Sequence, residues 1–261
     1  MTSIKKLFVA ALLAVVATTT LTSCASAPVE SGKIQIVAST STWADIASQI
    51  GGDLVEVTAL IDDVNKDPHS YEASARDQLA VNNADIVIAN GGGYDDFMNK
   101  LVDTSNDSTK LFDSCEQQSA VACATNEHIW YSASQVKDVG NVIFSALETV
   151  DRNSTPIYES NLAEFEAQIK LIEIRTAEIA SAWGGAKVFA TEPLIYYLLQ
   201  DTGMVDITPA EFAEAIEEER DVAPAVMLEA QDAVKQAKFI AVNSSTRTAQ
   251  IDQVLSDASA T

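Results

Sequence analysis

Short apolar runs alternate with amphipathic stretches along most of this chain. The run Ile34-Gln35-Ile36-Val37-Ala38-Ser39 predicts a buried strand, and the segment from Trp43 to Ile50, which ends at Gly51-Gly52, predicts a helix after it. The pattern then repeats, with strands predicted at 55–61, 84–90, 110–112, 187–191, 205–207 and 239–243, and helices at 73–83, 95–101, 136–150, 155–183, 194–202, 209–218, 225–237 and 248–255. Strands that alternate with helices indicate parallel sheets covered on both faces.

The segment from Thr155 to Trp183 is the longest predicted helix. Thr155 can cap it, Pro156 suits its first turn, and Gly184-Gly185 ends it. Apolar side chains recur along it at three- and four-residue steps: Leu162, Phe165, Ile169, Ile172, Ile179 and Trp183. At 1.5 Å per residue the helix spans roughly 40 Å, more than one small domain needs. We therefore expect an α/β protein of two lobes with parallel sheets, joined by this one long bridging helix.

The N-terminus has the pattern of a targeting segment. Lys5 and Lys6 precede the apolar run from Leu7 to Val16, which has signal-peptide length and is too short to span a bilayer. The following Leu21-Thr22-Ser23-Cys24 resembles the bacterial lipobox, which implies cleavage before Cys24 and attachment of lipid to its sulfur. The alternative is an ordinary secretory signal with a chance cysteine. We expect an extracytoplasmic protein, anchored by lipid to the cell membrane.

These patterns predict a division of the chain into segments. We expect a lipoprotein signal peptide at 1–23, a tether at 24–32, an N-terminal α/β lobe at 33–150, the bridging segment at 151–185 and a C-terminal α/β lobe at 186–261. No strand follows the last predicted helix, so the C-terminal lobe is expected to be truncated.

Composition and the positions of the cysteines reduce the range of possible functions. The chain of 261 residues is 47% hydrophobic and 21% charged, as globular proteins are, and its formal charge of −22 argues against nucleic-acid binding. Cys115 and Cys123 lie close together in a polar segment, and outside the cytoplasm such a pair is a candidate disulfide. A thiolate metal pair is the alternative, although the spacing is wider than zinc sites use.

Three residues with metal-ligand chemistry follow predicted strands or precede a helix. His69 lies in the turn Asp67-Pro68-His69 after one strand, His128 lies just before a helix, and Glu192 directly follows the strand 187–191. Ligands of open α/β sheets gather at the carboxyl ends of strands, and two imidazoles with a carboxylate suit Zn²⁺ or Mn²⁺. Taken singly, each is more simply a surface, packing or helix-capping residue. If both histidines bind metal, protons should compete for them near pH 6.5.

Several motifs occur in a fixed order that resembles one family. They are Ala38-Ser39-Thr40-Ser41-Thr42-Trp43, Gly51-Gly52-Asp53, Asp67-Pro68-His69-Ser70-Tyr71-Glu72, Ala84-Asp85-Ile86-Val87 and Glu127-His128-Ile129-Trp130. Together they resemble the metal-binding lipoproteins of zinc and manganese ABC importers, the cluster A-I family, some of whose members were labelled adhesins. The resemblance implies two α/β lobes with the metal between them, a permease partner and a monomer.

The resemblance also implies site residues. His69, His128 and Glu192 match three family metal ligands, and the fourth is an acidic residue on a loop after a further strand, which would lie beyond residue 261. Glu72 and Glu127 are candidate acceptors that orient the imidazoles, or solvated side chains. Trp43 and Trp130 could wall the site, with core packing the simpler interpretation.

Two other function classes remain open at this point. A metal-dependent hydrolase would need an open coordination position and a general base, and no H-E-x-x-H motif is present. An adhesin or structural lipoprotein would have no transport role. We expect a carrier rather than an enzyme.

Overall fold

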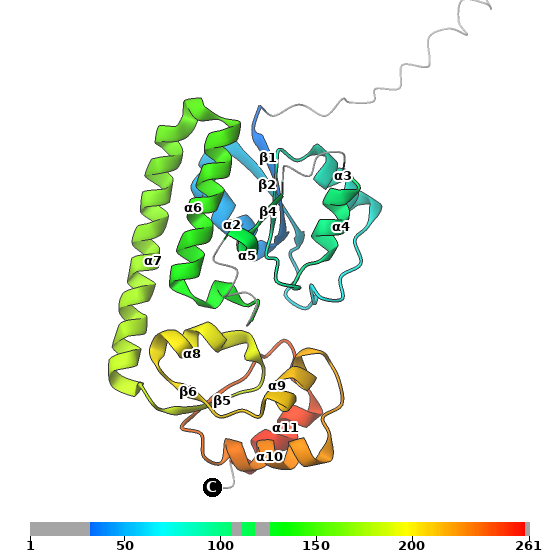
Figure 1. The fold of residues 1–261 in the computed structure, drawn as a ribbon, viewed down its shortest axis with the longest axis vertical. Coiled ribbons are helices and arrows are strands. Elements are labelled where there is room, and N and C mark those ends of the chain that lie inside the picture. The colour runs from blue at the N-terminus through cyan, green and yellow to red at the C-terminus, as the bar shows by residue number, and fades with distance from the viewer. Residues whose placement is uncertain (1–31, 106–110, 118–125, 259–261) are drawn as a thin grey trace, which may run out of the picture. The chain divides into compact units, whose positions relative to one another are not determined.

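The computed structural model describes residues 32–105, 111–117 and 126–258 (Figure 1). From Lys33 onward the chain forms one compact unit. It contains two parallel sheets, each flanked by helices, and a long helix that packs beside both groups of elements (Figure 1). The predicted fold class, α/β with parallel sheets and a long helix, is confirmed. The segment boundaries at 150 and 186 stay a prediction.

The first sheet has four strands in the order β2-β1-β3-β4. Every neighbouring pair is parallel, with Ile36 opposite Val57 on one side and opposite Ile86 on the other. Parallel strands bring their carboxyl ends to the same edge of the sheet, so the loops after them meet there. The strands are β1 (Ile34–Thr40), β2 (Val55–Ile61), β3 (Ile86–Ala89) and β4 (Leu111–Asp113).

Alternating side chains of this sheet contribute to two cores. Ile36 and Ile88 pack in one core with Trp43, which is fully buried, whereas Val37 and Val87 pack in the other. Helices therefore cover both faces, as the near-continuous apolar strands predict. The first core is closed by α2 (Ser41–Gly51), α6 (Ala133–Val150) and the first half of the long helix, and the second by α3 (Ala75–Asn83) and α4 (Phe97–Asp103).

The second sheet has three parallel strands in the order β6-β5-β7. Its main core lies on the side of Phe189, whose ring centroid is 5.6 Å from that of Phe212. On the opposite side, Leu199 and Val188 line a small apolar cavity. The elements are β5 (Lys187–Ala190), β6 (Val205–Asp206), β7 (Phe239–Ala241), α8 (Tyr196–Thr202), α9 (Ala210–Glu217), α10 (Pro224–Val234) and α11 (Ala249–Ala258).

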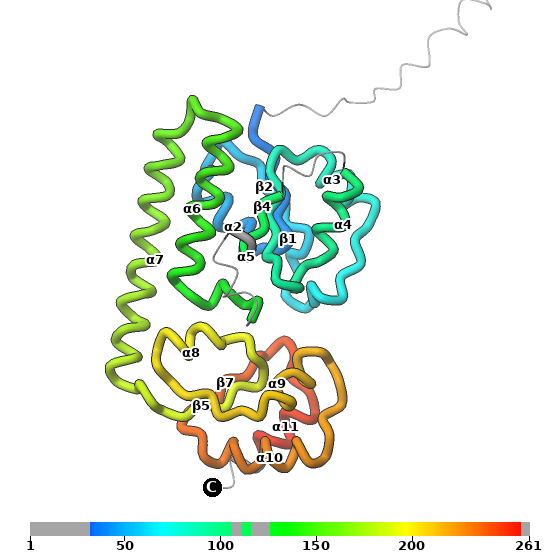
Figure 2. Tube along the Cα trace, in the orientation of Figure 1, coloured from blue at the N-terminus to red at the C-terminus, as the bar shows by residue number. Residues whose placement is uncertain are grey.

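The long helix is α7 (Thr155–Trp183), which has 29 residues and follows Ser154 as its N-cap (Figure 2). In its first half Phe165 and Ile169 are buried in the core of the first sheet. In its second half Ile172 is 52% and Ile179 41% exposed. Of the apolar side chains that recur along α7, those beyond Ile169 are therefore not buried, because α7 there leaves the first core.

Short elements connect these parts. The polar segment that holds Cys115 and Cys123 begins with a one-turn helix in its described part. The short elements are α5 (Ser114–Gln117), η2 (Gly52–Leu54), η4 (Ile129–Tyr131), η5 (Arg152–Ser154) and η6 (Pro193–Ile195).

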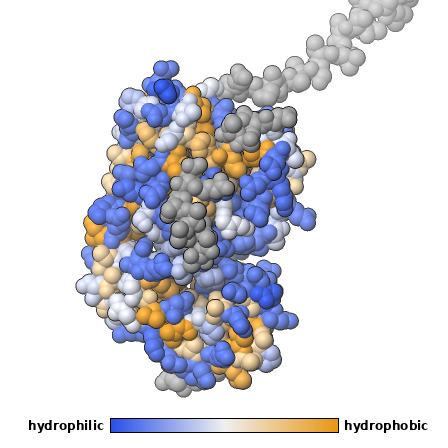
Figure 3. Space-filling model, viewed as in Figure 1, coloured by the Kyte–Doolittle hydropathy of each residue, from blue (hydrophilic) through white to orange (hydrophobic). Residues whose placement is uncertain are grey.

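The visible face of the molecule is largely covered by polar residues, with smaller apolar patches between them (Figure 3). Among the described residues, none of the helices combines the length and the apolar character that crossing a bilayer requires.

Candidate metal centre

A cavity of about 350 Å³ is lined by loops and helix ends from both halves of the chain. His69, His128 and Glu192, the three ligands predicted from the sequence, all line it. They come from the loop after β2, the segment before η4 and the end of β5, which agrees with ligands gathering at the carboxyl ends of parallel strands. Other polar side chains that line it include Asp63, Asn65, Lys66, Asp67, Glu217, Glu219, Asn243, Ser245 and Thr246.

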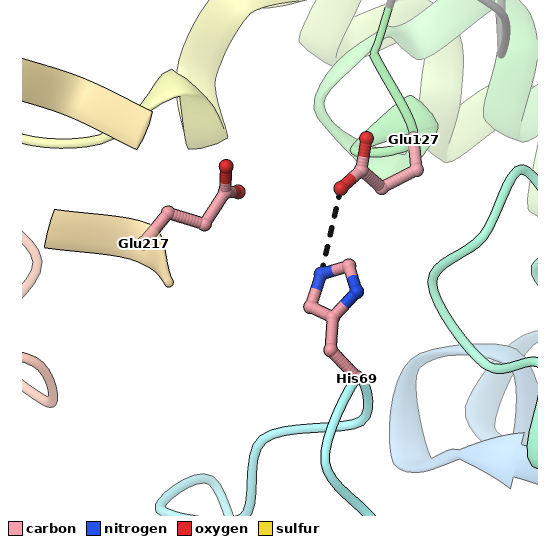
Figure 4. A group of neighbouring side chains, drawn as sticks. All are labelled: His69, Glu127 and Glu217. Carbon is pink, nitrogen blue, oxygen red and sulfur yellow. Dashed lines mark ion pairs between the residues drawn. The ribbon is translucent and has the colours of Figure 1, made fainter. Parts of the chain in front are cut away.

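His69 is presented by a tight turn after β2. Its backbone N–H donates a 3.0 Å hydrogen bond to Oδ1 of Asp67, across the Pro68 that separates them. The side chain is 37% exposed, and its Nε2 lies 3.4 Å from Oε1 of Glu127. Figure 4 shows these two side chains facing each other. The sequence offered Glu127 as an acceptor that orients an imidazole, and its carboxylate does contact one, that of His69.

His128 is buried, and Asn126 fixes which of its ring nitrogens carries the proton. Oδ1 of Asn126 accepts the His128 backbone N–H at 2.8 Å, and its Nδ2 donates to the carbonyl of Pro193 at 3.1 Å. The amide orientation is thus determined, and the same Oδ1, 2.9 Å from Nδ1 of His128, requires Nδ1 to be the donor. Nε2 of His128 therefore carries the lone pair that a metal ion needs.

That Nε2 faces a carboxylate. Oε1 of Glu217, the last residue of α9, lies 3.2 Å from it. Burial, and then the charges of Glu127 and Glu192, raise the pKa of Glu217 from 4.5 to about 8. Burial, and then the nearby His69, lower the pKa of His128 from 6.5 to about 4. His128 is thus neutral at physiological pH, and the prediction that protons compete for it near pH 6.5 is wrong.

Aromatic rings hold the two imidazoles in place. The Tyr94 ring packs against both, with its centroid 5.2 Å from that of His69 and 5.9 Å from that of His128. Trp130 lies 5.1 Å from His128 and lines the cavity, so it does wall the site, whereas Trp43 belongs to the core. The rings restrict the rotamers of both histidines, which lowers the entropy lost on binding a ligand.

The turn after β3 positions Tyr94. Gly91 has a φ of +79°, and a Cβ there would lie 2.0 Å from Oδ1 of Asp113. Asp95 is almost fully buried and accepts the backbone N–H groups of Asn90 and Gly91 at 2.7 and 2.9 Å. This turn lets the backbone approach the site closely, which only glycine tolerates at such a φ.

Glu192 is buried in the same cavity, and its two oxygens are already hydrogen-bonded. Nδ2 of Asn243 donates to Oε2 at 2.9 Å, and the Thr246 hydroxyl donates to Oε1. Both donors lie on the loop after β7, so this loop orients the carboxylate toward the cavity.

One group of ligand atoms in the described residues is close enough to bind a common ion. Atoms of His69, Glu127 and Glu217 all lie within 4.8 Å of one another, and they come from three separate elements (Figure 4). The structure thus brings His69 together with two glutamates and sets His128 against one of them. Sequence reasoning missed Glu217, because its place at the end of an acidic helix resembles a solvated position.

The cysteines are described only in part. Cys115 is buried and disulfide-bonded. Cys123, its expected partner, and Cys24, the expected lipidation site, lie outside the described residues. The pairing of Cys115 with Cys123 and the lipidation of Cys24 stay predictions.

A family model described as "ZnuA: Zinc-uptake complex component A periplasmic" matches residues 36–261. The chain belongs to this family. The resemblance inferred from the ordered motifs is thereby confirmed, and the family is named for a component of a transport complex rather than for an enzyme.

Curated relatives agree with this membership. The metal ABC transporter substrate-binding lipoprotein FimA of Streptococcus parasanguinis is 28% identical over 184 residues, 66% of this chain and 58% of that protein. The manganese ABC transporter substrate-binding lipoprotein PsaA of Streptococcus pneumoniae is 27% identical over the same shares. The chain thus spans less than two-thirds of these relatives.

A periplasmic metal-binding protein from Candidatus Liberibacter asiaticus has the same fold, with a TM-score of 0.72 and 23% identity, over 88% of this chain and 86% of that one.

Proposed function

We propose that this family member captures a divalent transition-metal ion, Zn²⁺ or Mn²⁺, outside the cytoplasm and delivers it to an ABC permease. The observation that carries the proposal is the cavity in which both histidines of the chain converge with carboxylates from the other half. Imidazole and carboxylate are the ligands that such ions prefer. Relatives named as metal ABC transporter substrate-binding proteins support the transport role.

The chemistry of the cavity suits reversible capture. His128 is neutral and oriented, so it offers a lone pair without first losing a proton. His69 is partly exposed, so an incoming ion can reach it from solvent. A carrier must also release its cargo, and an open cavity with an exposed ligand favours release over the closed sites of structural metals.

Calorimetry of Zn²⁺ and Mn²⁺ binding tests the metal site. We expect His69→Ala and His128→Ala each to weaken binding at least about tenfold, or 1.4 kcal/mol, since each removes one ligand. Gln253→Ala, which changes an exposed residue of α11, is the control and should bind as wild type does. Equal binding by all four proteins would place the metal elsewhere and remove the basis of the proposal.

A cellular assay separates transport from adhesion. In cells that lack the endogenous carrier, the wild-type chain should restore metal accumulation and His69→Ala should not. An adhesive role would survive the loss of metal binding, so adhesion that persists in His69→Ala cells without any difference in metal uptake would favour the adhesin alternative.

Cys24 is the proposed membrane anchor. The charged n-region, the short apolar run and the lipobox-like motif support it, and the relatives' names describe lipoproteins. Wild-type protein should fractionate with membranes and Cys24→Ala with the soluble fraction. Mass spectrometry that finds the mature chain beginning elsewhere would contradict the anchor. We further propose that the mature chain acts as a monomer, which light scattering would test.

A further inference from the structure

Glu217 was not among the ligands that the motifs suggest. It ends α9, which precedes β7, so it is not the acidic residue that the family resemblance places after a further strand. Its carboxylate nevertheless lies in the cavity, 3.2 Å from Nε2 of His128 and within 4.8 Å of ligand atoms of His69 and Glu127. Figure 4 shows its side chain pointing toward the space that His69 and Glu127 also face.

The contact between Glu217 and His128 needs a proton or a cation between the two side chains. Asn126 holds the proton of His128 on Nδ1, so the Nε2 that faces Glu217 is an acceptor. An ionised carboxylate is also only an acceptor, so in the ion-free protein a proton on the Glu217 carboxyl is the donor that this contact needs. A bound metal ion can take the place of that proton, because it too is a positive centre between two acceptor atoms that lie 3.2 Å apart, one of them on a side chain that is 4% exposed.

The surroundings favour a cation as that centre. The C-terminal end of an α-helix carries a partial negative charge, and Glu217 lies at that end of α9. The Glu127 carboxylate lies within 4.8 Å of that of Glu217, and Glu192 adds a further carboxylate to the lining of the cavity. Lys66 lines the cavity but forms a cation–π contact with Tyr71, 5.8 Å from the ring centroid. A bound divalent ion would satisfy both acceptors at once.

We propose that Glu217 is a direct ligand of the captured metal ion and binds it together with Nε2 of His128 and Nε2 of His69. This proposal rests on the proposed function, since it concerns the same cargo. It assigns a ligand from the second half of the chain that bonds the ion opposite the two histidines of the first half. Loading would thus join the halves through Glu217 as well as through Glu192.

Two variants of Glu217 separate ligation from a general effect of charge. Glu217→Gln removes the charge and weakens the donor, whereas Glu217→Asp keeps the charge and shortens the reach by one methylene. A direct ligand predicts at least about tenfold weaker Mn²⁺ binding for both. An effect of the electric field alone predicts weaker binding for Glu217→Gln only, and that result would overturn the proposal.

Glu214→Gln is the matched control. Glu214 is exposed on the same helix, one turn before Glu217, and its substitution changes the net charge by the same amount. It should bind Mn²⁺ as wild type does. A comparable loss in Glu214→Gln would show that the overall charge of α9, and not ligation, controls affinity, and would also overturn the proposal.

The visible spectrum of Co²⁺-loaded protein reports the ligands directly, because the d–d bands of Co²⁺ depend on the coordination sphere. Both Glu217 variants should change the bands, and Glu214→Gln should not. Unchanged bands and affinity in both Glu217 variants would overturn the proposal while leaving the carrier function intact. If the wild-type protein binds neither Mn²⁺ nor Co²⁺, the proposed function fails, and this proposal fails with it.

Discussion

The hydroxyl of Tyr197 donates a 2.7 Å hydrogen bond to the backbone carbonyl of Asn126. Tyr197 belongs to α8 and Asn126 begins the segment that carries His128, so this bond joins the second half of the chain to a ligand-bearing loop. A second bond, from Nδ2 of Asn126 to the carbonyl of Pro193, joins the same parts.

The first prediction concerns this link. Tyr197→Phe leaves a buried carbonyl without its hydroxyl donor, which should lower the free energy of unfolding by about 1–2 kcal/mol. It should also weaken metal binding a few-fold, because His128 is less firmly placed. Tyr196→Phe removes the same oxygen one residue earlier and is the control. Denaturant titration and calorimetry of both variants make the comparison, and equal stability losses would contradict the role of Tyr197.

The second prediction concerns the tautomer of His128. Asn126→Ala removes the acceptor that keeps the proton on Nδ1, so we expect metal affinity to fall about 10- to 100-fold. Asn126→Asp keeps an acceptor oxygen and should retain most of the affinity. Nitrogen-15 NMR of the ion-free imidazole should show Nδ1 protonated in wild type and a mixture of tautomers in Asn126→Ala. A wild-type spectrum with Nε2 protonated would refute this assignment.

The third prediction concerns the pH dependence of stability without metal. The pKa of His128 is lowered from 6.5 to about 4, so its contribution to stability is present above pH 6.5 and is lost as pH falls through 4. The pKa of Glu217 is raised from 4.5 to about 8, so its contribution is present below pH 4.5 and is lost as pH rises through 8.

The two contributions oppose each other between pH 4.5 and 6.5, and above 6.5 only that of Glu217 changes. The contribution of these two groups to stability, and with it the melting temperature, should therefore fall between pH 6.5 and pH 8. Thermal melts in chelator should show this fall in wild type and in Glu214→Gln, and a much smaller one in Glu217→Gln. A fall of the same size in Glu217→Gln would mean that another group causes it.

The fourth prediction concerns the turn that positions Tyr94. Gly91→Ala would place a Cβ 2.0 Å from Oδ1 of Asp113 at a φ of +79°, and should cost clearly more than the roughly 1–2 kcal/mol of left-handed strain alone. Gly93 has a φ of +96°, and a Cβ added there would have no atom within 4 Å. Gly93→Ala should therefore cost only the free energy of the left-handed backbone strain. The difference between the two variants, measured by chemical denaturation, isolates the steric term. Equal losses would show that Asp113 moves aside.

The fifth prediction concerns the cysteines. Cys115 is disulfide-bonded, and we expect Cys123 as its partner. In unreduced, denatured mature protein neither should react with a thiol reagent, and both should react after reduction. Peptide mapping should find the two residues in one cross-linked fragment, and free thiols at both positions would contradict the pairing.

Much of the fold could be predicted from local patterns. The run 34–39 and the strand Val55–Ile61 are both apolar and bounded by turn residues, so periodicity sufficed to place β1 and β2. Burial along α7 could not be predicted in this way. Ile169 and Ile172 have equivalent places in the apolar pattern, but only Ile169 meets a neighbouring core. Which half of a long helix finds a partner depends on tertiary packing.

The residues of the site could likewise be predicted only in part. His69 and His128 could be found because each lies in a short motif beside a strand or a helix start. Glu217 could not, because its helix end resembles a solvated one in sequence and meets His128 only through the arrangement of the two halves. Glu192 was found as a strand end, whereas its donors Asn243 and Thr246 come from a loop some fifty residues later.

From Lys170 to Ala180 no residue of α7 is buried. This stretch is supported by its own backbone hydrogen bonds and by ion pairs such as Lys170 with Glu173 at 2.7 Å and Arg175 with Glu178 at 2.6 Å, which contribute little in solvent. A short local unfolding event here would disturb neither core, so its backbone amides should exchange with deuterium faster than those around Phe165. An ion held by ligands from both halves opposes their separation. Slower deuterium exchange in this stretch after metal is added would therefore indicate that the distant metal site is occupied.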